Sequence, residues 1–105
     1  MAKSPTQCTL DKWRKLGYMC EVVEKTIPKT FIKKDLFGFV DVLAVGHGET
    51  VAIQTTSADH VSHRVRKIED MPERVAELRN ANWRLVVEGW KKPGHRWECR
   101  EVDIS

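Results

Sequence analysis

An aspartate in the middle of an apolar run is the feature of this sequence that most limits how the chain can fold. Residues 39–45 (FVDVLAV) are apolar at every position except Asp41. A continuous apolar run of this length is typical of a central strand that is covered on both faces. A carboxylate inside such a strand is costly unless another group makes use of it. The run therefore predicts a layered α/β fold in which Asp41 has a specific role.

The rest of the sequence predicts the elements around that strand. Ser4 and Pro5 begin a helix that ends before Gly17, and Ser57 begins a second helical region that Pro72 interrupts. We expect helices at 5–16, from 58 onward and at 72–80. We expect strands at 18–25, 39–45, 50–56, 83–90 and 96–104, with an irregular stretch at 26–34. The order predicts one domain over residues 1–105, with a mixed central sheet flanked by helices.

The turn after the central strand determines which side chains meet. If a hairpin places Val45 opposite Thr50, the same register places Asp41 opposite Gln54. Because side chains alternate with a period of two, Thr56 then lies on the same face as Gln54. Cβ atoms of opposed residues are about 4.5–5.5 Å apart. Two polar side chains of apolar strands are therefore predicted to meet at one point.

This arrangement resembles the PD-(D/E)XK nuclease superfamily, and within it the small Holliday-junction resolvases. That family has an acid on the first helix, an aspartate in a hairpin and E-x-K on the next strand. Here Asp41 occupies the aspartate position, Gln54 the glutamate position thirteen residues later, and Thr56 the lysine position. The first-helix position falls near Thr6 or Gln7, and neither is acidic. The resemblance covers most of the chain and implies a restriction-endonuclease-like α-β-β-β-α-β core.

The resemblance implies a DNA endonuclease that depends on Mg²⁺ or Mn²⁺. Asp41 and Gln54 would hold the ion near the Thr55 carbonyl, and Asp41, Gln54 and Thr56 would form the catalytic set. A glutamine oxygen can bind Mg²⁺ but brings no charge. Thr56 cannot replace a lysine that stabilises charge on the phosphoryl oxygens. Two alternatives therefore stay open, namely a DNA-binding module without catalysis and a protein-interaction module that forms a homodimer, as resolvases do.

Basic residues flank the predicted site on both sides in the sequence. Lys33 and Lys34 precede the Asp41 strand, and His60, Arg64 and Lys67 form one helical stripe at i, i+4, i+7. We expect these five residues to bind DNA phosphates largely without sequence specificity, and Arg64 or Lys67 to replace the missing lysine. The net charge of +3 does not by itself indicate nucleic acid, so a solvated helix face and a scattered basic surface remain the alternatives.

Cysteine usage and the N-terminal sequence predict the compartment. The three cysteines are widely spaced and contain no C-x-x-C, which favours free thiols in a reducing cytoplasm. The first residues contain no apolar segment of a signal peptide, and no apolar run is long enough to span a bilayer. We therefore expect a cytoplasmic protein that binds DNA and does not associate with membranes.

Overall fold

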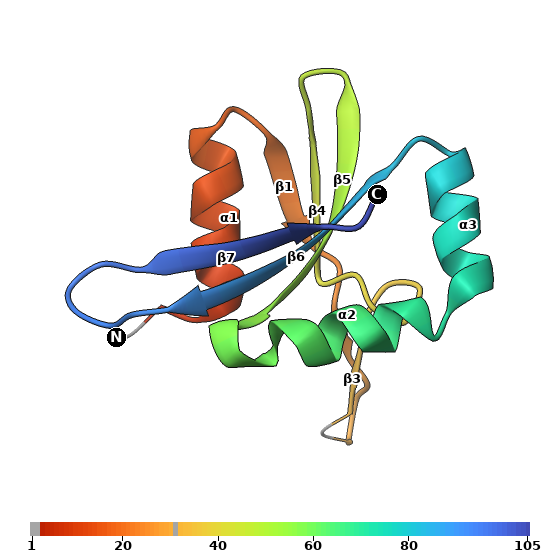
Figure 1. Ribbon diagram of the computed structural model, residues 1–105. Coiled ribbons are helices and arrows are strands. Elements are labelled where there is room, and N and C mark those ends of the chain that lie inside the picture. Colours follow the sequence, from red (N-terminus) through yellow and green to blue (C-terminus); the bar gives the residue numbers. More distant parts are fainter. Residues whose placement is uncertain (1–2, 31) are drawn as a thin grey trace.

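A mixed five-stranded sheet forms the centre of the computed structural model, which describes residues 3–30 and 32–105 (Figure 1). The strand order is β1-β4-β5-β6-β7. These strands are β1 (Met19–Val22), β4 (Val42–Gly46), β5 (Glu49–Ser57), β6 (Arg84–Lys91) and β7 (Glu98–Asp103). Neighbouring strands are antiparallel except β5 and β6, which are parallel. The predicted α/β class with a mixed sheet is thus confirmed.

The helices begin close to the positions that the capping residues predict. They are α1 (Pro5–Lys15), the short 3-10 helix η1 (Ala58–His60), α2 (Val61–Glu69) and α3 (Pro72–Asn80). The backbone N–H of Gln7 donates to Ser4 Oγ at 3.1 Å, which caps α1 as expected. Gly17 follows α1 with a φ of +93°, a conformation that favours glycine after a helix. The α-helix after Ser57 begins only at Val61, because a 3-10 turn comes first.

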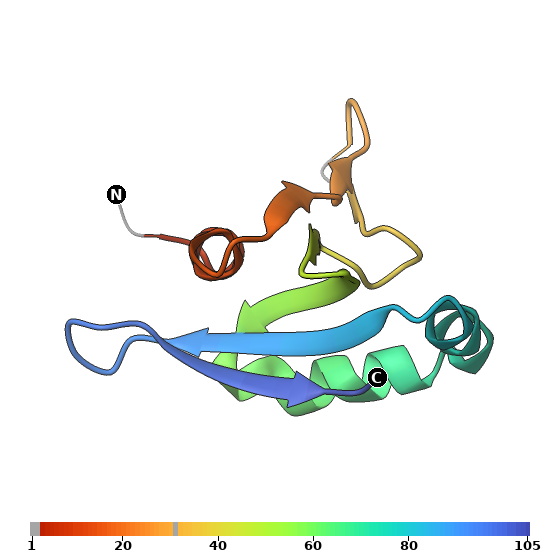
Figure 2. The same ribbon diagram turned by 90° about the horizontal axis from the view of Figure 1, so that it is seen from above.

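The two faces of the sheet are covered by different helices (Figure 2). Leu10 and Trp13 of α1 pack on one face, against a core that includes Val42, Ile53 and Val86. The helices α2 and α3 pack on the other face, in a core that comprises Phe39, Val40, Ala52, Val61, Ile68, Val75, Leu78, Leu85 and Val87. Successive residues of β5 therefore face different layers, and Gln54 belongs to the layer of α2 and α3.

Gly89 allows the start of α2 to lie close to the sheet. A Cβ at this position would lie 2.2 Å from Val61 Cγ2 and 2.8 Å from Ala58 Cα. Both distances are shorter than van der Waals contact, so no larger residue fits without a shift of η1 and α2. The start of α2 can therefore pack closely on β6 because Gly89 has no side chain.

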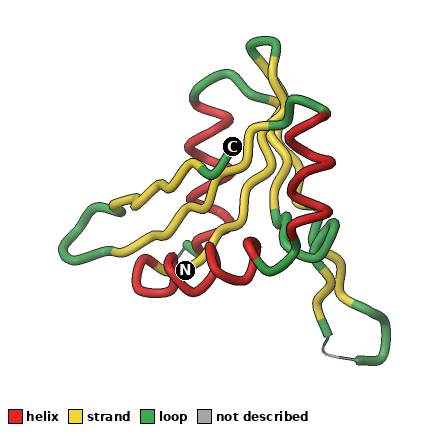
Figure 3. Tube along the Cα trace, turned by 45° about the vertical axis from the view of Figure 1, so that its right-hand side comes forward, coloured by secondary structure: helices red, strands yellow, loops and turns green. Residues whose placement is uncertain are grey.

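The segment predicted to be irregular at 26–34 instead contains most of a small hairpin. Strands β2 (Lys25–Thr26) and β3 (Lys33–Lys34) form a separate antiparallel pair, and Phe31 between them lies outside the described residues. This hairpin extends away from the main sheet (Figure 3). The sequence signal was weak, because these strands are exposed and have no alternation of apolar and polar residues.

The central strands also differ in length from the expectation. The strand β1 ends at Val22 rather than Lys25, and β4 begins at Val42 rather than Phe39. A tight turn closed by a bridge between Leu36 and Val40 occupies the preceding residues. The predicted register is nevertheless confirmed, with Val45 opposite Thr50. No helix among the described residues is long and apolar enough to cross a membrane.

Candidate functional site

Asp41 and Gln54 meet in the interior, as the register predicts. The backbone N–H of Asp41 donates to Ile53 O at 2.9 Å and so extends the β4–β5 pairing by one residue. Gln54 Nε2 donates to Asp41 Oδ2 at 2.5 Å, and the backbone N–H of Thr55 donates to the same oxygen at 3.0 Å. The exposed fractions of Asp41 and Gln54 are only 4% and 3%. Both side chains are thus buried and hydrogen-bonded directly to each other.

Two further carboxylates lie beside Asp41. One oxygen each from Glu24, Asp35 and Asp41 lies within 4.8 Å of the others. Glu24 directly precedes β2 and Asp35 directly follows β3, so the small hairpin brings them together. We call these three residues the acidic trio. Sequence reasoning missed Glu24 and Asp35, although acids flanking the lysine-rich stretch 25–34 at both ends were a signal that could have found them.

The charged groups in closest contact with Asp41 are the other two acids of the trio. Burial and, to a smaller extent, the Asp35 carboxyl beside it raise the pKa of Asp41 to about 8, although the Thr55 N–H opposes this shift by favouring the ionised form. The negative charge of Glu24 also contributes to the increase. Among the described residues, no cation lies within ion-pair distance of Asp41. A bound cation would therefore relieve the repulsion within the trio.

The acidic trio opens into a polar cavity of about 330 Å³. Gln54, Thr55 and Thr6 also line it, together with the cations Lys33, Arg64 and Lys67. Five of the residues predicted from the sequence thus share one cavity: Asp41, Gln54, Lys33, Arg64 and Lys67.

Three predicted residues do not line this cavity. Thr56 is buried on β5 opposite Gly89, where it replaces the lysine of the family pattern without reaching the cavity. His60 Nδ1 is instead 2.8 Å from Ser57 Oγ, in a local contact at the start of the helix. Lys34 lies opposite Lys25 in the small hairpin. At the first-helix position Thr6 does line the cavity, but its hydroxyl brings no charge.

Two buried polar atoms at this cavity lack hydrogen-bond partners among the described residues. They are Gln54 Oε1 and Arg64 Nε. A buried polar group without a partner costs free energy, and such groups are rare enough to need an explanation. Gln54 and the three carboxylates line one cavity, and their oxygens are of the kind that Mg²⁺ and Mn²⁺ prefer. The trio contains no histidine or cysteine, so its chemistry does not suit a structural zinc site.

Comparison with known proteins gave no relative from which to transfer a function. No protein-family model, curated protein or solved structure matches this chain. The resemblance to PD-(D/E)XK nucleases therefore stays a prediction from the residues around Asp41 and Gln54.

Proposed function

We propose that this protein binds DNA and a divalent cation, Mg²⁺ or Mn²⁺, in the cavity of the acidic trio, and cleaves a phosphodiester bond there. The observation that carries the proposal is the combination in one cavity of three carboxylates, an unpartnered buried amide oxygen and three cations. Apart from the small hairpin β2–β3, the order α1-β1-β4-β5-η1-α2-α3-β6 supports a restriction-endonuclease-like core. The parallel pairing of β5 with β6 across α2 and α3 is compatible with that topology.

The cavity residues divide into ion ligands and phosphate ligands. Glu24, Asp35 and Asp41 would hold the cation, with Gln54 Oε1 as a neutral ligand. A divalent cation held by these residues would supply an activated water as the nucleophile of hydrolysis. In such a hydrolysis the water oxygen would form a bond to phosphorus, the bond from phosphorus to the leaving oxygen would break, and the leaving oxygen would take up a proton from solvent in place of the one that the water releases.

The proposed phosphate ligands are cations at positions outside the PD-(D/E)XK motif. Arg64 and Lys67 reach the cavity from α2, and Lys33 reaches it from the small hairpin. Their charge would offset the charge that develops on the phosphoryl oxygens. If Arg64→Ala and Lys67→Ala both leave DNA binding and cleavage unchanged, these residues do not replace the missing lysine.

DNA binding without cleavage is the second candidate function. Thr56 supports it, because this buried residue stands at the lysine position and carries no charge. A single electrostatic contributor to catalysis is typically worth about 10²–10³ in rate. The loss of the lysine can therefore leave a cation-dependent binding module with the same cavity.

One panel of DNA substrates separates the two functions. We would incubate junction, duplex and single-stranded DNA with Mn²⁺ and measure binding and cleavage for wild type, Asp41→Asn and Asp11→Asn. Asp11 is an exposed carboxylate of α1 and serves as the matched control. We expect Asp41→Asn to lower cleavage at least about 100-fold, while Asp11→Asn has no effect.

A restored motif completes the panel. The pair Gln54→Glu with Thr56→Lys rebuilds the usual motif, and cleavage gained only by this pair would favour the binding module. A melting temperature that responds to neither Mn²⁺ nor DNA would contradict both functions, because a ligand of the native state raises it.

A further inference from the structure

The small hairpin concentrates positive charge that has little compensation. Residues 25–34 contain four lysines and no acidic residue. Lys25 and Lys34 lie directly opposite each other in the β2–β3 pair. Like charges in opposed positions of two strands are destabilising, and an isolated two-stranded hairpin is marginally stable in water. Among the described residues, the only ion pair of this hairpin joins Lys33 Nζ to Glu24 Oε1 at 3.4 Å.

The same hairpin determines whether the acidic trio is assembled. Glu24 precedes Lys25, and Asp35 follows Lys34, so pairing of the two lysines places Glu24 and Asp35 side by side. Two adjacent positions of the hairpin thus each bring like charges together, cations at one position and anions at the next. The lysines repel each other within the hairpin, and the carboxylates repel each other at its base. Both repulsions oppose closing of the hairpin. A bound anion would neutralise the lysines, and a bound cation would neutralise the carboxylates.

We propose that the hairpin couples DNA binding to cation binding: phosphates bound by Lys25 and Lys34 and a divalent ion bound by the acidic trio each stabilise the closed hairpin. Each ligand then raises the affinity for the other, and thermodynamic linkage requires that the two factors are equal. This inference rests on the proposed binding of DNA and of a divalent cation.

Nucleic acid is the anion that can contact both groups of cations, the lysines of the hairpin and the cations of the cavity. Lys33, Arg64 and Lys67 line the cavity, whereas the hairpin extends away from the body of the protein (Figure 1). The repeating phosphates of a duplex can reach both places along one backbone, which a single small anion cannot do.

The decisive experiment compares the coupling in wild type and in a hairpin without the lysine pair. We would measure the Kd of a cleavage-resistant phosphorothioate duplex by fluorescence anisotropy, with and without saturating Mn²⁺ at constant ionic strength. Mn²⁺ binding would be measured by calorimetry without DNA. For wild type we expect Mn²⁺ to lower the Kd for DNA about fivefold or more, within the usual range of coupling between two sites.

The double variant Lys25→Thr, Lys34→Thr replaces the repulsion by a favourable Thr–Thr pair. We expect weaker DNA binding, tighter Mn²⁺ binding without DNA, and a coupling factor below about two, since the hairpin now closes without an anion. The control is Lys91→Thr with Lys92→Thr, which removes the same charge at the far end of β6. It should keep the coupling of wild type.

Each other outcome overturns the inference in a recognisable way. If a phosphate oxygen simply coordinates the ion, the coupling persists unchanged in Lys25→Thr, Lys34→Thr, and the hairpin has no part in it. If wild type binds both ligands independently, coupling is absent altogether. If wild type binds neither ligand, the proposed function itself is wrong.

Discussion

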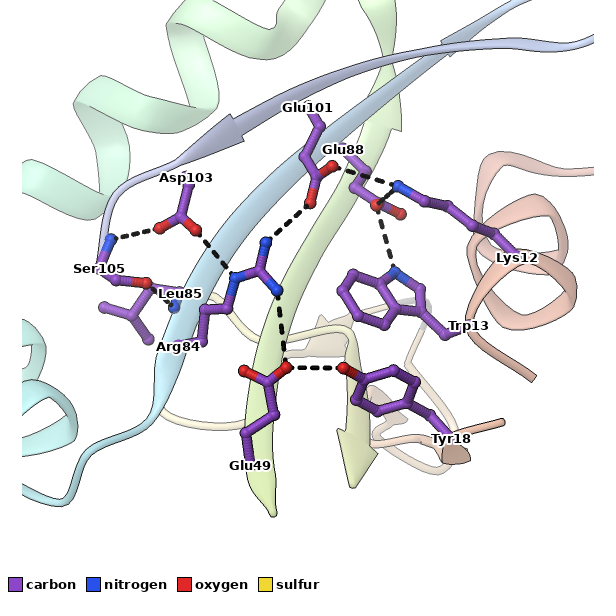
Figure 4. A network of polar contacts seen from close by, with 10 residues as sticks. All are labelled: Lys12, Trp13, Tyr18, Glu49, Arg84, Leu85, Glu88, Glu101, Asp103 and Ser105. Atoms are coloured by element: carbon purple, nitrogen blue, oxygen red, sulfur yellow. Dashed lines mark hydrogen bonds and ion pairs between the residues drawn. The ribbon is translucent and has the colours of Figure 1, made fainter. Parts of the chain in front are cut away.

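Glu88 on β6 and Asp41 before β4 are both nearly inaccessible carboxylates of one sheet, yet among the described residues Glu88 has an ion-pair partner and Asp41 has none. Glu88 is fully buried and accepts hydrogen bonds from Lys12 Nζ at 2.5 Å and Trp13 Nε1 at 3.2 Å (Figure 4). It also accepts from Thr9 Oγ1 at 3.0 Å. Asp41 has an amide and a backbone N–H as donors, and the charged groups beside it within 4.8 Å are the acids Glu24 and Asp35.

The difference separates a structural carboxylate from a candidate ligand. The partners of Glu88 satisfy its oxygens and balance its charge, so the site needs nothing from solution. Asp41 has no ion-pair partner among the described residues, although three cations line the same cavity, so a proton or a bound ion would relieve its charge. Burial alone therefore does not identify a functional acid, whereas burial with unbalanced charge does.

Removal of the charge of Glu88 should give the largest loss of stability. Glu88→Gln leaves the half-buried Lys12 without its closest carboxylate, and breaking a buried pair in this way costs about 3 kcal/mol. Urea denaturation measures the free energy of unfolding, with Glu98→Gln on the exposed part of β7 as control. A loss below about 1 kcal/mol would mean that Glu88 is no more structural than a surface acid.

The stability of the metal-free protein should fall as the pH rises from about 4 to about 8. The pKa of Asp41 is about 8 in the folded state and close to 3.8 when unfolded, so within this window the folded state holds a proton that the unfolded state has lost. Stability gained at low pH is therefore lost as the pH approaches the folded value, by about 1.4 kcal/mol per pH unit between the two pKa values.

The variant Asp41→Asn isolates this dependence from that of other groups. Its amide cannot ionise, so the difference in unfolding free energy between wild type and Asp41→Asn should change across this window and level off above pH 8. A difference that is independent of pH would show that the trio does not destabilise the ionised Asp41 carboxylate.

A fourth carboxylate beside the acidic trio should increase the difference between the Asp41 site and the Glu88 site. Gln54→Glu adds a charge next to Asp41, so we expect the metal-free protein to lose about 1 kcal/mol and the melting temperature to respond more strongly to Mn²⁺. Asn80→Asp makes the same change from amide to carboxylate at an exposed position of α3. An equal response to Mn²⁺ in both variants would argue against an ion at the trio.

The exposed ion pairs around Arg84 should contribute least. Arg84 lies near Glu49, Glu101 and Asp103, but its side chain is 36% exposed (Figure 4). Exposed pairs are worth at most about 1 kcal/mol, so Arg84→Gln should cost about 0.5 kcal/mol and less in high salt. A cost as large as that of Glu88→Gln would show that the number of partners matters more than burial.

The contact between Asp41 and Gln54 could be predicted because a single local feature determines it. The turn after Gly46 fixes the register, and both residues of that turn, His47 and Gly48, have positive φ values as two-residue hairpins require. Once the register is fixed, alternation places every side chain of the two strands. The same local logic located the start of α1 from Ser4 and Pro5.

The remaining parts of both carboxylate sites depend on contacts distant in sequence. Glu88 interrupts an apolar strand just as Asp41 does, but its partner Lys12 is 76 residues away. Nothing local distinguishes an acid with a buried partner from one without. Glu24 and Asp35 escaped prediction for a related reason, since only the pairing of two charged strands brings them to Asp41.

Gly89 has a consequence for how this cavity could be redesigned. Any larger residue there must push the start of α2 outward, and Arg64 and Lys67 are carried by that same helix. The strand that contains Gly89 contributes no residue to the lining of the cavity. The gap between the cations and the carboxylates can therefore be widened from a remote position, with every charge at the site left in place.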